Sequence, residues 1–384
     1  MIEKVQFRNF KAYRSLDLEL EPFTVLVGPN ASGKTTLLEG LHLVSQVARA
    51  SLGKADDHQY MDESMRSYGL TEPANLGVTG TWTRVGGTAR VQEASYSIHT
   101  AKGVEQRPAF TITGSWAGRD FPVSGHETTH RDRTGDSLFS PPLSVFRNAL
   151  GATAVLRFEP RRLAESSYSD EEEPSLSSDG SGLASVLAHY KLSRDEAFRE
   201  IEDALRQIVP AVQRIRIERA IVRVRNEKLL SNIEQPLWGN QLVLDMKGAK
   251  GVPASAAGEG TLMALGLLAV VLGPAQPHLV LLDDIELALH PAAQARLVEV
   301  LRKIQKHKPE LQIVATSHSP FILNYLDPKE VRMTFLAEHG FARCEKLTAH
   351  PEYEKWKDLM APGEFWSTVG EAWIGKLGGA AANE

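Results

Sequence analysis

The sequence predicts an α/β fold in which a mixed sheet is flanked by helices and carries an inserted antiparallel β and helical lobe. Three apolar runs of strand length support this prediction, each followed at once by glycine or polar residues. They cover residues 23–27, 279–282 and 311–315. Continuous apolar runs of this length are typical of buried strands in sheets that are covered on both faces.

The first 50 residues contain strands and then a helix. Residues 2–27 alternate between apolar and polar side chains in IEKVQFRNF and LDLELEPFTVLVG, which predicts strands. The second apolar run ends at a glycine-rich loop. A helix is expected from Lys34 to about Ala50.

An inserted lobe is expected after this helix. Residues 76–123 show β-branched and aromatic side chains in two-residue alternation, which predicts an antiparallel meander. Residues 124–142 and 165–182 are polar, and the second of these segments is acidic and serine-rich, so both predict surface loops. Helical spacing follows in residues 183–209 and strand spacing in residues 212–224. From about residue 279 the pattern is strand, helix, strand.

Composition excludes two broad classes of protein. The chain has 384 residues, of which 42% are hydrophobic, and this excludes a disordered chain because a large core can form. The formal net charge of −5 excludes the chain-wide basic field of a dedicated nucleic-acid coat. Any DNA contact must therefore be local.

The sequence also predicts a cytoplasmic location. Cys344 is the only cysteine, so no intramolecular disulfide can form, and MIEKVQFRNF lacks the apolar core of a secretion signal. The longest apolar stretch, residues 262–272, ends at Gly273 and Pro274, well short of the ~20 residues that span a bilayer. It predicts a buried helix, and no membrane partner is expected.

The glycine-rich loop fits a phosphate-binding motif. GPNASGKT matches G-x-x-x-x-G-K-[ST] and lies between an apolar strand and a helix, which is the context the motif requires. Gly28 and Gly33 let the backbone amides turn toward a phosphate, and Lys34 neutralises its oxygens. The residues assigned to nucleotide binding are Gly28, Pro29, Asn30, Ala31, Ser32, Gly33, Lys34, Thr35 and Thr36, and the expected ligand is ATP with Mg²⁺.

A pair of carboxylates forms the second candidate site. The apolar strand in HLVLLDDIELALHP delivers Asp283 to the end of the sheet, where it can hold Mg²⁺ together with the Thr35 hydroxyl. Asp284 can then orient the attacking water. The alternative is a buried strand that ends in a solvated acidic turn, and the phosphate loop favours the functional interpretation.

A histidine follows another predicted core strand. Thr316, Ser317 and His318 come directly after LQIVA, so the imidazole should reach the end of the same sheet. A lone histidine is more often structural. Its place after a core strand favours a role in sensing the γ-phosphate.

Together, these segments resemble the ABC-type ATPase heads of the SMC, RecF and OLD group, and most closely the stand-alone OLD-like ATPases of bacteria. The likeness covers most of the chain. It rests on VQFRNFKAYRSLDLEL, TVLVGPNASGKTTLLEGL, DGSGLASVL, SAAGEGTLMALGLLAV, LLDDIELALHP, IVATSHSPFILNYLDP and APGEFWSTVGEAWI.

The resemblance implies a division of the chain into head, insertion and tail. Residues 1–50 and 251–340 would form the two parts of the ATPase head, and residues 51–250 the inserted β and helical lobe with its loops. Residues 341–384 would form a C-terminal tail. The fold expected from the resemblance is that of a P-loop NTPase of the ABC-ATPase head type.

The resemblance also implies a signature segment that binds a nucleotide held by a second subunit. Gly258, Glu259 and Gly260 lie in this segment and open the apolar helix, whose N-terminal amides favour an anion. The alternative is a glycine cap before a core helix. The usual signature serine is missing, because the aligned position is Ala256 or Gly258.

Two further departures from the family concern hydrolysis. Asp284 stands where most ABC heads have glutamate, so hydrolysis is expected to be slow, or Glu286 shares the role of Asp284. The glutamine loop is not located, and Gln46 and Gln92 are only candidates.

By resemblance, the chain is expected to be a dimeric switch that closes over two Mg-ATP molecules and reopens on hydrolysis. No DxD-type acidic cluster follows the histidine loop, so a nuclease or other DNA-processing effector would be a separate protein. Phage defence is a setting that the family implies. The alternatives are a RecF-like DNA clamp with negligible turnover and, disfavoured by the NFKAYRSLDLEL opening, a transporter ATPase subunit.

Two segments remain ambiguous between binding and structural roles. Arg214, Arg216, Arg223 and Arg225 have strand spacing, so several can share a face that binds DNA phosphates, although a solvated face interrupted by glutamates is favoured. Near the C-terminus, packing is favoured over docking for a group of aromatic residues: Trp356, Phe365, Trp366 and Trp373.

Overall fold

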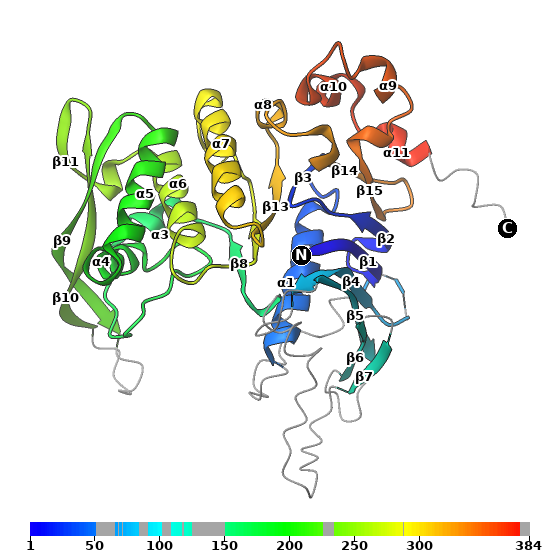
Figure 1. The fold of residues 1–384 in the computed structure, drawn as a ribbon, viewed down its shortest axis with the longest axis horizontal. Coiled ribbons are helices and arrows are strands. Elements are labelled where there is room, and N and C mark those ends of the chain that lie inside the picture. Colours follow the sequence, from blue (N-terminus) through cyan, green and yellow to red (C-terminus); the bar gives the residue numbers. More distant parts are fainter. Residues whose placement is uncertain are drawn as a thin grey trace, which may run out of the picture. The chain divides into compact units, whose positions relative to one another are not determined.

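The computed structural model divides the chain into two compact units, Met1–Thr153 with Glu310–Glu384, and Ala154–Pro309 (Figure 1). Each unit is described by itself. The structure describes residues 1–50, 66–67, 69–70, 72–83, 91–101, 109–116, 119–124, 150–225, 234–286 and 288–376.

The first unit contains an antiparallel sheet in the strand order β2-β1-β4-β5-β6-β7. The four strands from β4 to β7 follow one another as a meander, which confirms the prediction for residues 76–123. Apolar side chains of β1 and β4 are buried, among them Val5, Phe7 and Leu76. The strands are β1 (Ile2–Phe10), β2 (Tyr13–Glu19), β4 (Asn75–Thr83), β5 (Val91–Ala101), β6 (Ala109–Trp116) and β7 (Arg119–Ser124).

The first unit also contains β3 (Phe23–Val27), which lies between two parallel neighbours, β13 (Gln312–Ser317) and β14 (Val331–Leu336). Every residue of β3 is buried, as the continuous apolar run predicts. β15 (Ala342–Lys346) pairs antiparallel with β14. α1 (Lys34–Ala50) follows β3 after the glycine-rich loop and begins and ends where the sequence predicts.

Short helices complete the first unit. Phe365 is buried, and His350 packs edge-on against it and against Trp373, which supports packing for the aromatic tail. These elements are α8 (Pro320–Leu323), η5 (Pro328–Glu330), η6 (Leu347–Ala349), α9 (Tyr353–Trp356), α10 (Pro362–Val369) and α11 (Ala372–Lys376).

The second unit contains a three-stranded antiparallel sheet in the order β11-β10-β9 together with helices that pack against it or against one another. The predicted helical segment at residues 183–209 is two helices, α4 and α5, because the chain leaves helical geometry at Arg194. The elements are α3 (Pro160–Ala164), α4 (Leu183–Ser193), α5 (Asp195–Ile208), β9 (Val212–Arg225), β10 (Glu234–Met246), β11 (Ala249–Pro253), η4 (Ala254–Ala256) and α6 (Glu259–Val271).

The remaining elements of the second unit carry its functional candidates. β12 (Leu279–Leu282) is buried throughout and lies beside β8 (Thr153–Leu156), and α7 (Pro291–His307) follows β12. α6 is buried along most of its length, which confirms the prediction of a buried helix for residues 262–272. Within the described ranges, no helix combines the length and apolar character needed to cross a bilayer.

A close contact between α1 and β1 gives a test of this packing. Gly40 lies inside α1, and a Cβ atom there would lie 2.3 Å from Cζ of the buried Phe7 ring. We expect Gly40→Ala to lower the free energy of unfolding by about 1–3 kcal/mol in urea denaturation, although alanine normally favours a helix. In a Phe7→Leu background the same substitution should cost less. Strict additivity of the two changes would contradict the contact.

Candidate functional site

The loop between β3 and α1 has a backbone that only glycine permits at two places. Gly28 and Gly33 have φ angles of 145° and 99°, in the region that L side chains rarely adopt. A Cβ atom on Gly28 would also lie 2.3 Å from the carbonyl oxygen of Thr334 in β14. Pro29, Asn30 and Ala31 at the crest of the loop are exposed. The loop is thus packed on one side and open on the other.

The lysine of the motif is held by its own loop. Lys34 is 6% exposed, and its Nζ donates to the carbonyl oxygens of Gly28 and Pro29, each at 2.8 Å. Both acceptors are neutral, whereas phosphate oxygens are charged and are better partners for an ammonium group. The donor set therefore fits a nucleotide phosphate. Thr35 and Thr36 follow in the first turn of α1, and Thr35 is exposed.

Three buried side chains hold the loop on its packed side: Ser32 belongs to the motif, and Tyr13 and Thr334 lie outside it. The hydroxyl of Tyr13 donates to the carbonyl oxygen of Gly33 at 3.2 Å, and complete burial raises the pKa of Tyr13 well above its usual value, so it stays a neutral donor. Ser32 Oγ lies 2.5 Å from Oγ1 of Thr334. Tyr13 and Thr334 were not predicted as site residues, because they are far from the motif in sequence.

The histidine loop reaches the same edge of the sheet as the phosphate loop. β13 runs parallel to β3 with Ser317 paired to Val27, so His318 and Gly28 each follow the last paired residue of their strand. His318 is exposed. Thr316 and Ser317, expected just after the strand, are its last two residues and are buried in it. The first unit therefore brings together the loop, Lys34 and the histidine loop.

The second unit contains the acidic pair at the end of β12. Asp283 is half-buried, and its backbone N–H donates to the carbonyl oxygen of Leu156 in β8 at 3.1 Å. Asp284 is exposed and has φ of 55°, a left-handed conformation that aspartate tolerates better than most residues. Glu286 is half-buried and comes two positions after Asp284.

The two candidate ligands for Mg²⁺ come from different units. Thr35 follows the loop after β3 in the first unit, and Asp283 follows β12 in the second. Mg²⁺ takes oxygen ligands and commonly combines one or two side chains with phosphate oxygens and water. The Thr35 hydroxyl and the Asp283 carboxylate are each, taken singly, a ligand type that suits Mg²⁺.

The predicted signature segment lies at the start of α6. Gly258 is the N-cap residue, and Glu259 and Gly260 are the first residues of the helix. Gly258 has φ of −63°, and the nearest atom to a Cβ atom there would be Oγ1 of Thr261 at 3.8 Å. Glycine is therefore not required at this position by the backbone or by packing.

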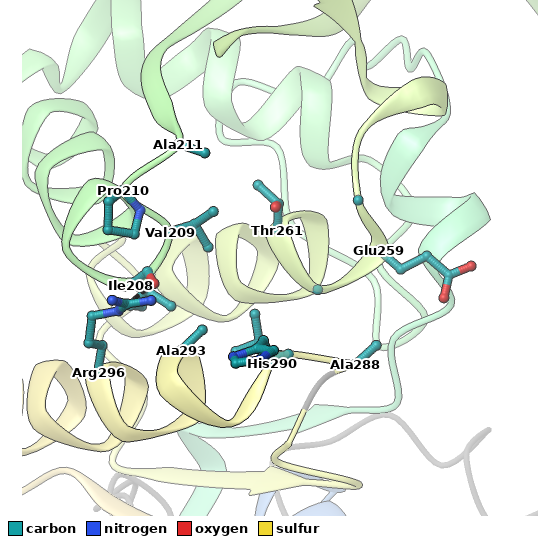
Figure 2. Close-up of a pocket in the computed structure, with 13 residues that line it drawn as sticks. Ile208, Val209, Pro210, Ala211, Glu259, Thr261, Ala288, His290, Ala293 and Arg296 are labelled. Atoms are coloured by element: carbon teal, nitrogen blue, oxygen red, sulfur yellow. Dashed lines mark hydrogen bonds between the residues drawn. The ribbon is translucent and has the colours of Figure 1, made fainter. Parts of the chain in front are cut away.

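The predicted signature segment lines a hollow of about 590 Å³ in the second unit (Figure 2). His290, the N-cap of α7, accepts a hydrogen bond from the N–H of Ala292 and lines the hollow together with Arg296. Arg296 Nε donates to the carbonyl oxygen of Ile208 at 3.0 Å. Figure 2 shows the Glu259 carboxylate pointing away from these side chains. His290 was not predicted as a site residue, although the proline that follows it, Pro291, is typical of the first position of a helix.

The arginines of β9 do not share one face. Pairing with β10 places Arg214 and Arg216 on one side of the sheet and Arg223 on the other. Successive side chains of a strand point to opposite faces, and the offset from Arg216 to Arg223 is odd. Arg216 is ion-paired with Glu218 and with Asp245, the latter at 3.4 Å. The side chain of Arg225 lies outside the described residues, as does that of Gln92, while Gln46 is half-exposed on α1.

Comparison with known proteins gives several partial sequence matches. The chain is 46% identical over 44 residues to the OLD nuclease of Thermus scotoductus, covering 12% of this chain and 8% of that protein. It is 28% identical over 131 residues to the DNA double-strand break repair Rad50 ATPase of Methanopyrus kandleri (29% and 15%). It is 37% identical over 76 residues to the DNA replication and repair protein RecF of Roseiflexus castenholzii (20% and 19%). The chain thus spans less than a fifth of each of these relatives.

Solved structures extend the likeness to most of the chain. An SMC head bound to the C-terminal winged-helix domain of ScpA superposes with a TM-score of 0.57 at 14% identity, over 92% of this chain and 99% of that one. An SMC head domain from Pyrococcus furiosus gives a TM-score of 0.51 at 12% identity, over 93% and 99%. These likenesses show the fold, which is the predicted P-loop ABC-ATPase head.

A protein-family match covers residues 23–324 and is described as "AAA domain, putative AbiEii toxin, Type IV TA system". Because this match spans most of the chain, the chain belongs to this AAA-domain family, and its similarity to OLD, RecF and SMC-type ABC ATPases agrees with that membership.

Proposed function

We propose that this chain binds and hydrolyses Mg-ATP and acts as a dimeric switch. The observation that carries the proposal is the loop between β3 and α1, where two glycines shape the backbone and a buried lysine is held at its opening. The Lys34 ammonium is bonded there to Gly28 and Pro29 carbonyls that a phosphate can replace. Family membership and the ABC-head fold support the same function.

The proposed roles follow from the chemistry of each side chain. Thr35 and Asp283 would hold the Mg²⁺ ion, which supplies charge neutralisation at the phosphates when bound. Asp284 would orient and deprotonate water, with Glu286 as the alternative base. His318, at the edge where the phosphate loop lies, would donate to the γ-phosphate.

The proposed switch needs a second subunit. Gly258, Glu259 and Gly260 begin a helix of 13 residues whose N-terminal amides favour an anion. By the family resemblance, that anion is the γ-phosphate bound by the other subunit, so ATP would close a two-fold dimer and hydrolysis would open it. We further propose that the movement controls a separate DNA-processing effector in a cytoplasmic setting such as phage defence. Arg214 and Arg216, which lie on one side of the sheet in β9, are the candidate contacts for DNA phosphates.

A second candidate function is a DNA clamp of RecF kind that uses ATP for dimerisation with negligible turnover. Asp284 favours it, because this carboxylate is one methylene shorter than the glutamate of most ABC heads and therefore reaches less far. Turnover separates the two functions. DNA-stimulated hydrolysis supports the switch, and ATP-dependent DNA retention without hydrolysis supports the clamp.

Nucleotide binding should depend on Lys34. Lys34→Ala removes the ammonium that pairs with phosphate oxygens, and we expect the Kd for Mg-ATP to rise by about 100-fold or more in isothermal titration calorimetry. Lys11→Ala, which removes a lysine paired with Glu39 elsewhere in the first unit, is the matched control and should bind normally. Equal affinity of Lys34→Ala and wild-type protein would refute the assignment of the loop.

Hydrolysis should depend on a carboxylate that follows Asp283 in the chain, either Asp284 or Glu286. Asp284→Asn is expected to bind Mg-ATP like the wild-type protein and to lose about 100-fold or more in steady-state phosphate release, because an amide cannot accept the water proton. Glu286→Gln is the parallel variant. Loss of turnover in Glu286→Gln with normal turnover in Asp284→Asn would transfer the role to Glu286.

Dimerisation should respond to charge at Gly258. There is room for a side chain at this position, so Gly258→Asp and Gly258→Asn should both fold and cap α6. They have nearly the same shape and differ by one charge. If the site meets a γ-phosphate in trans, the aspartate should weaken the ATP-dependent dimer by about fivefold or more relative to the asparagine.

Sedimentation with and without Mg-ATP measures the ATP-dependent dimerisation of the two Gly258 variants. The measurement uses an Asp284→Asn background, which retains the nucleotide. A monomer at saturating Mg-ATP in the Asp284→Asn protein would refute the dimeric switch. Equal dimerisation of the two Gly258 variants would place the interface elsewhere.

A further inference from the structure

A pair of buried hydroxyl groups joins the phosphate loop to β14. Ser32 belongs to the loop, and Thr334 comes from a strand about 300 positions later, with Oγ to Oγ1 at 2.5 Å. The two residues are 1% and 0% exposed. β14 pairs with β3 through Met333 and Val27, which places Thr334 beside Gly28. Only a residue without a Cβ atom at position 28 permits this approach.

The pair has three contacts but only two protons. Besides their mutual contact, Ser32 Oγ lies 2.7 Å from the carbonyl oxygen of Pro29, and Thr334 Oγ1 lies 3.0 Å from that of Val27. Each hydroxyl carries one proton, and each carbonyl can only accept. Two hydroxyl oxygen atoms at 2.5 Å need a proton between them. Only one of the two carbonyls can therefore accept a hydrogen bond from the pair at any time.

Two arrangements of the protons satisfy this count. In the first, Thr334 donates to Val27 and Ser32 donates to Thr334, so the hydroxyl pair gives nothing to Pro29. In the second, Thr334 donates to Ser32 and Ser32 donates to Pro29, so the hydroxyl pair gives nothing to Val27. In the described structure the Pro29 carbonyl also accepts from Lys34 Nζ at 2.8 Å and, at a longer 3.4 Å, from the backbone N–H of Ser32, so it has a donor in either arrangement.

We infer that Thr334 is a positioning residue for nucleotide binding. When a phosphate draws the Lys34 ammonium away from the loop, the Pro29 carbonyl loses its short bond to the lysine and keeps only the long one from the Ser32 N–H, and the second arrangement supplies the Ser32 hydroxyl as well. Thr334 supports this exchange because it donates to Ser32 as Ser32 turns its proton to Pro29, and an accepted hydrogen bond strengthens the one that a hydroxyl donates. The loop keeps its shape while its lysine changes partner. This inference rests on the proposed nucleotide function of the loop.

The test compares variants of Thr334 and Ser32 in the full chain. Thr334→Val removes the hydroxyl with little change in shape and should raise the Kd for Mg-ATP about three- to tenfold, the effect of one buried hydrogen bond. Thr334→Ser keeps the hydroxyl and should restore wild-type affinity. Ser32→Ala should cause the same loss as Thr334→Val, and the double variant should cause no further loss, because both changes break one chain of hydrogen bonds.

Thr24→Val is the matched control. Thr24 is equally buried in β3, and its hydroxyl bonds to the backbone of Glu21 at the opposite end of the strand from the loop. This variant should lower the thermal unfolding midpoint without changing the Kd. A purely structural role for Thr334 would make its valine variant behave in the same way.

Specific results would overturn the inference. Wild-type affinity in a folded Thr334→Val protein would do so, as would additive losses in the double variant. If Thr334→Val does not fold, Ser32→Ala decides alone, because it leaves the bond from Thr334 to Val27 intact. If the wild-type protein binds Mg-ATP as weakly as Lys34→Ala does, the nucleotide function itself is overturned. Normal wild-type binding with a silent Thr334→Val overturns only the role of the hydroxyl pair.

Discussion

The parallel register of β3 with β13 and β14 determines where the phosphate site of the first unit can form. Val27 is paired with Ser317 on one side and with Met333 on the other, so the groups that follow these residues emerge at one edge. They are the glycine-rich loop, His318 and Thr334. A shift of one residue would reverse the side chains of a strand and move these groups away from one another. Because every residue of β3 is buried, core packing specifies the register strongly. The site geometry is therefore a consequence of the same burial that stabilises the sheet.

The glycines of the loop serve packing as much as backbone freedom. A Cβ atom on Gly33 would lie 2.7 Å from Cβ of Ala342 and 2.9 Å from the hydroxyl of Tyr13. Gly28 meets Thr334 in the same way. The loop is thus seated against β14, β15 and Tyr13, and its exposed crest is held from below by buried groups. A loop that is fixed before its ligand arrives loses less conformational entropy on binding.

Sequence patterns predicted the elements that are apolar, periodic and bounded by turn residues. The helix at residues 34–50, the meander and the buried helix α6 were confirmed for this reason. β10 was not predicted, because proline and glycine interrupt the strand pattern in QPLWGNQLVLDM. In the structure, pairing with β9 along the whole length of β10 overrides that local signal. The phosphate loop and the acidic pair were predicted because their chemistry lies in contiguous motifs. Tyr13, Thr334 and Arg296 could not be predicted, because only the fold brings them to the loop or to the signature segment.

Lys34 shows how the loop balances stability against binding. Without a ligand, a buried ammonium group needs acceptors, since an unpaired buried charge costs several kcal/mol. The carbonyls of Gly28 and Pro29 meet that need, and they keep the lysine at the place where a phosphate would bind. The same bonds compete with the phosphate, so part of its attraction to Lys34 is spent on breaking them. A neighbouring donor that can take over one of the released carbonyls lowers this competition without loosening the unliganded loop. The Ser32 side chain reaches both Pro29 and Thr334 of β14, and this makes the strand, as well as the loop, part of the binding equilibrium.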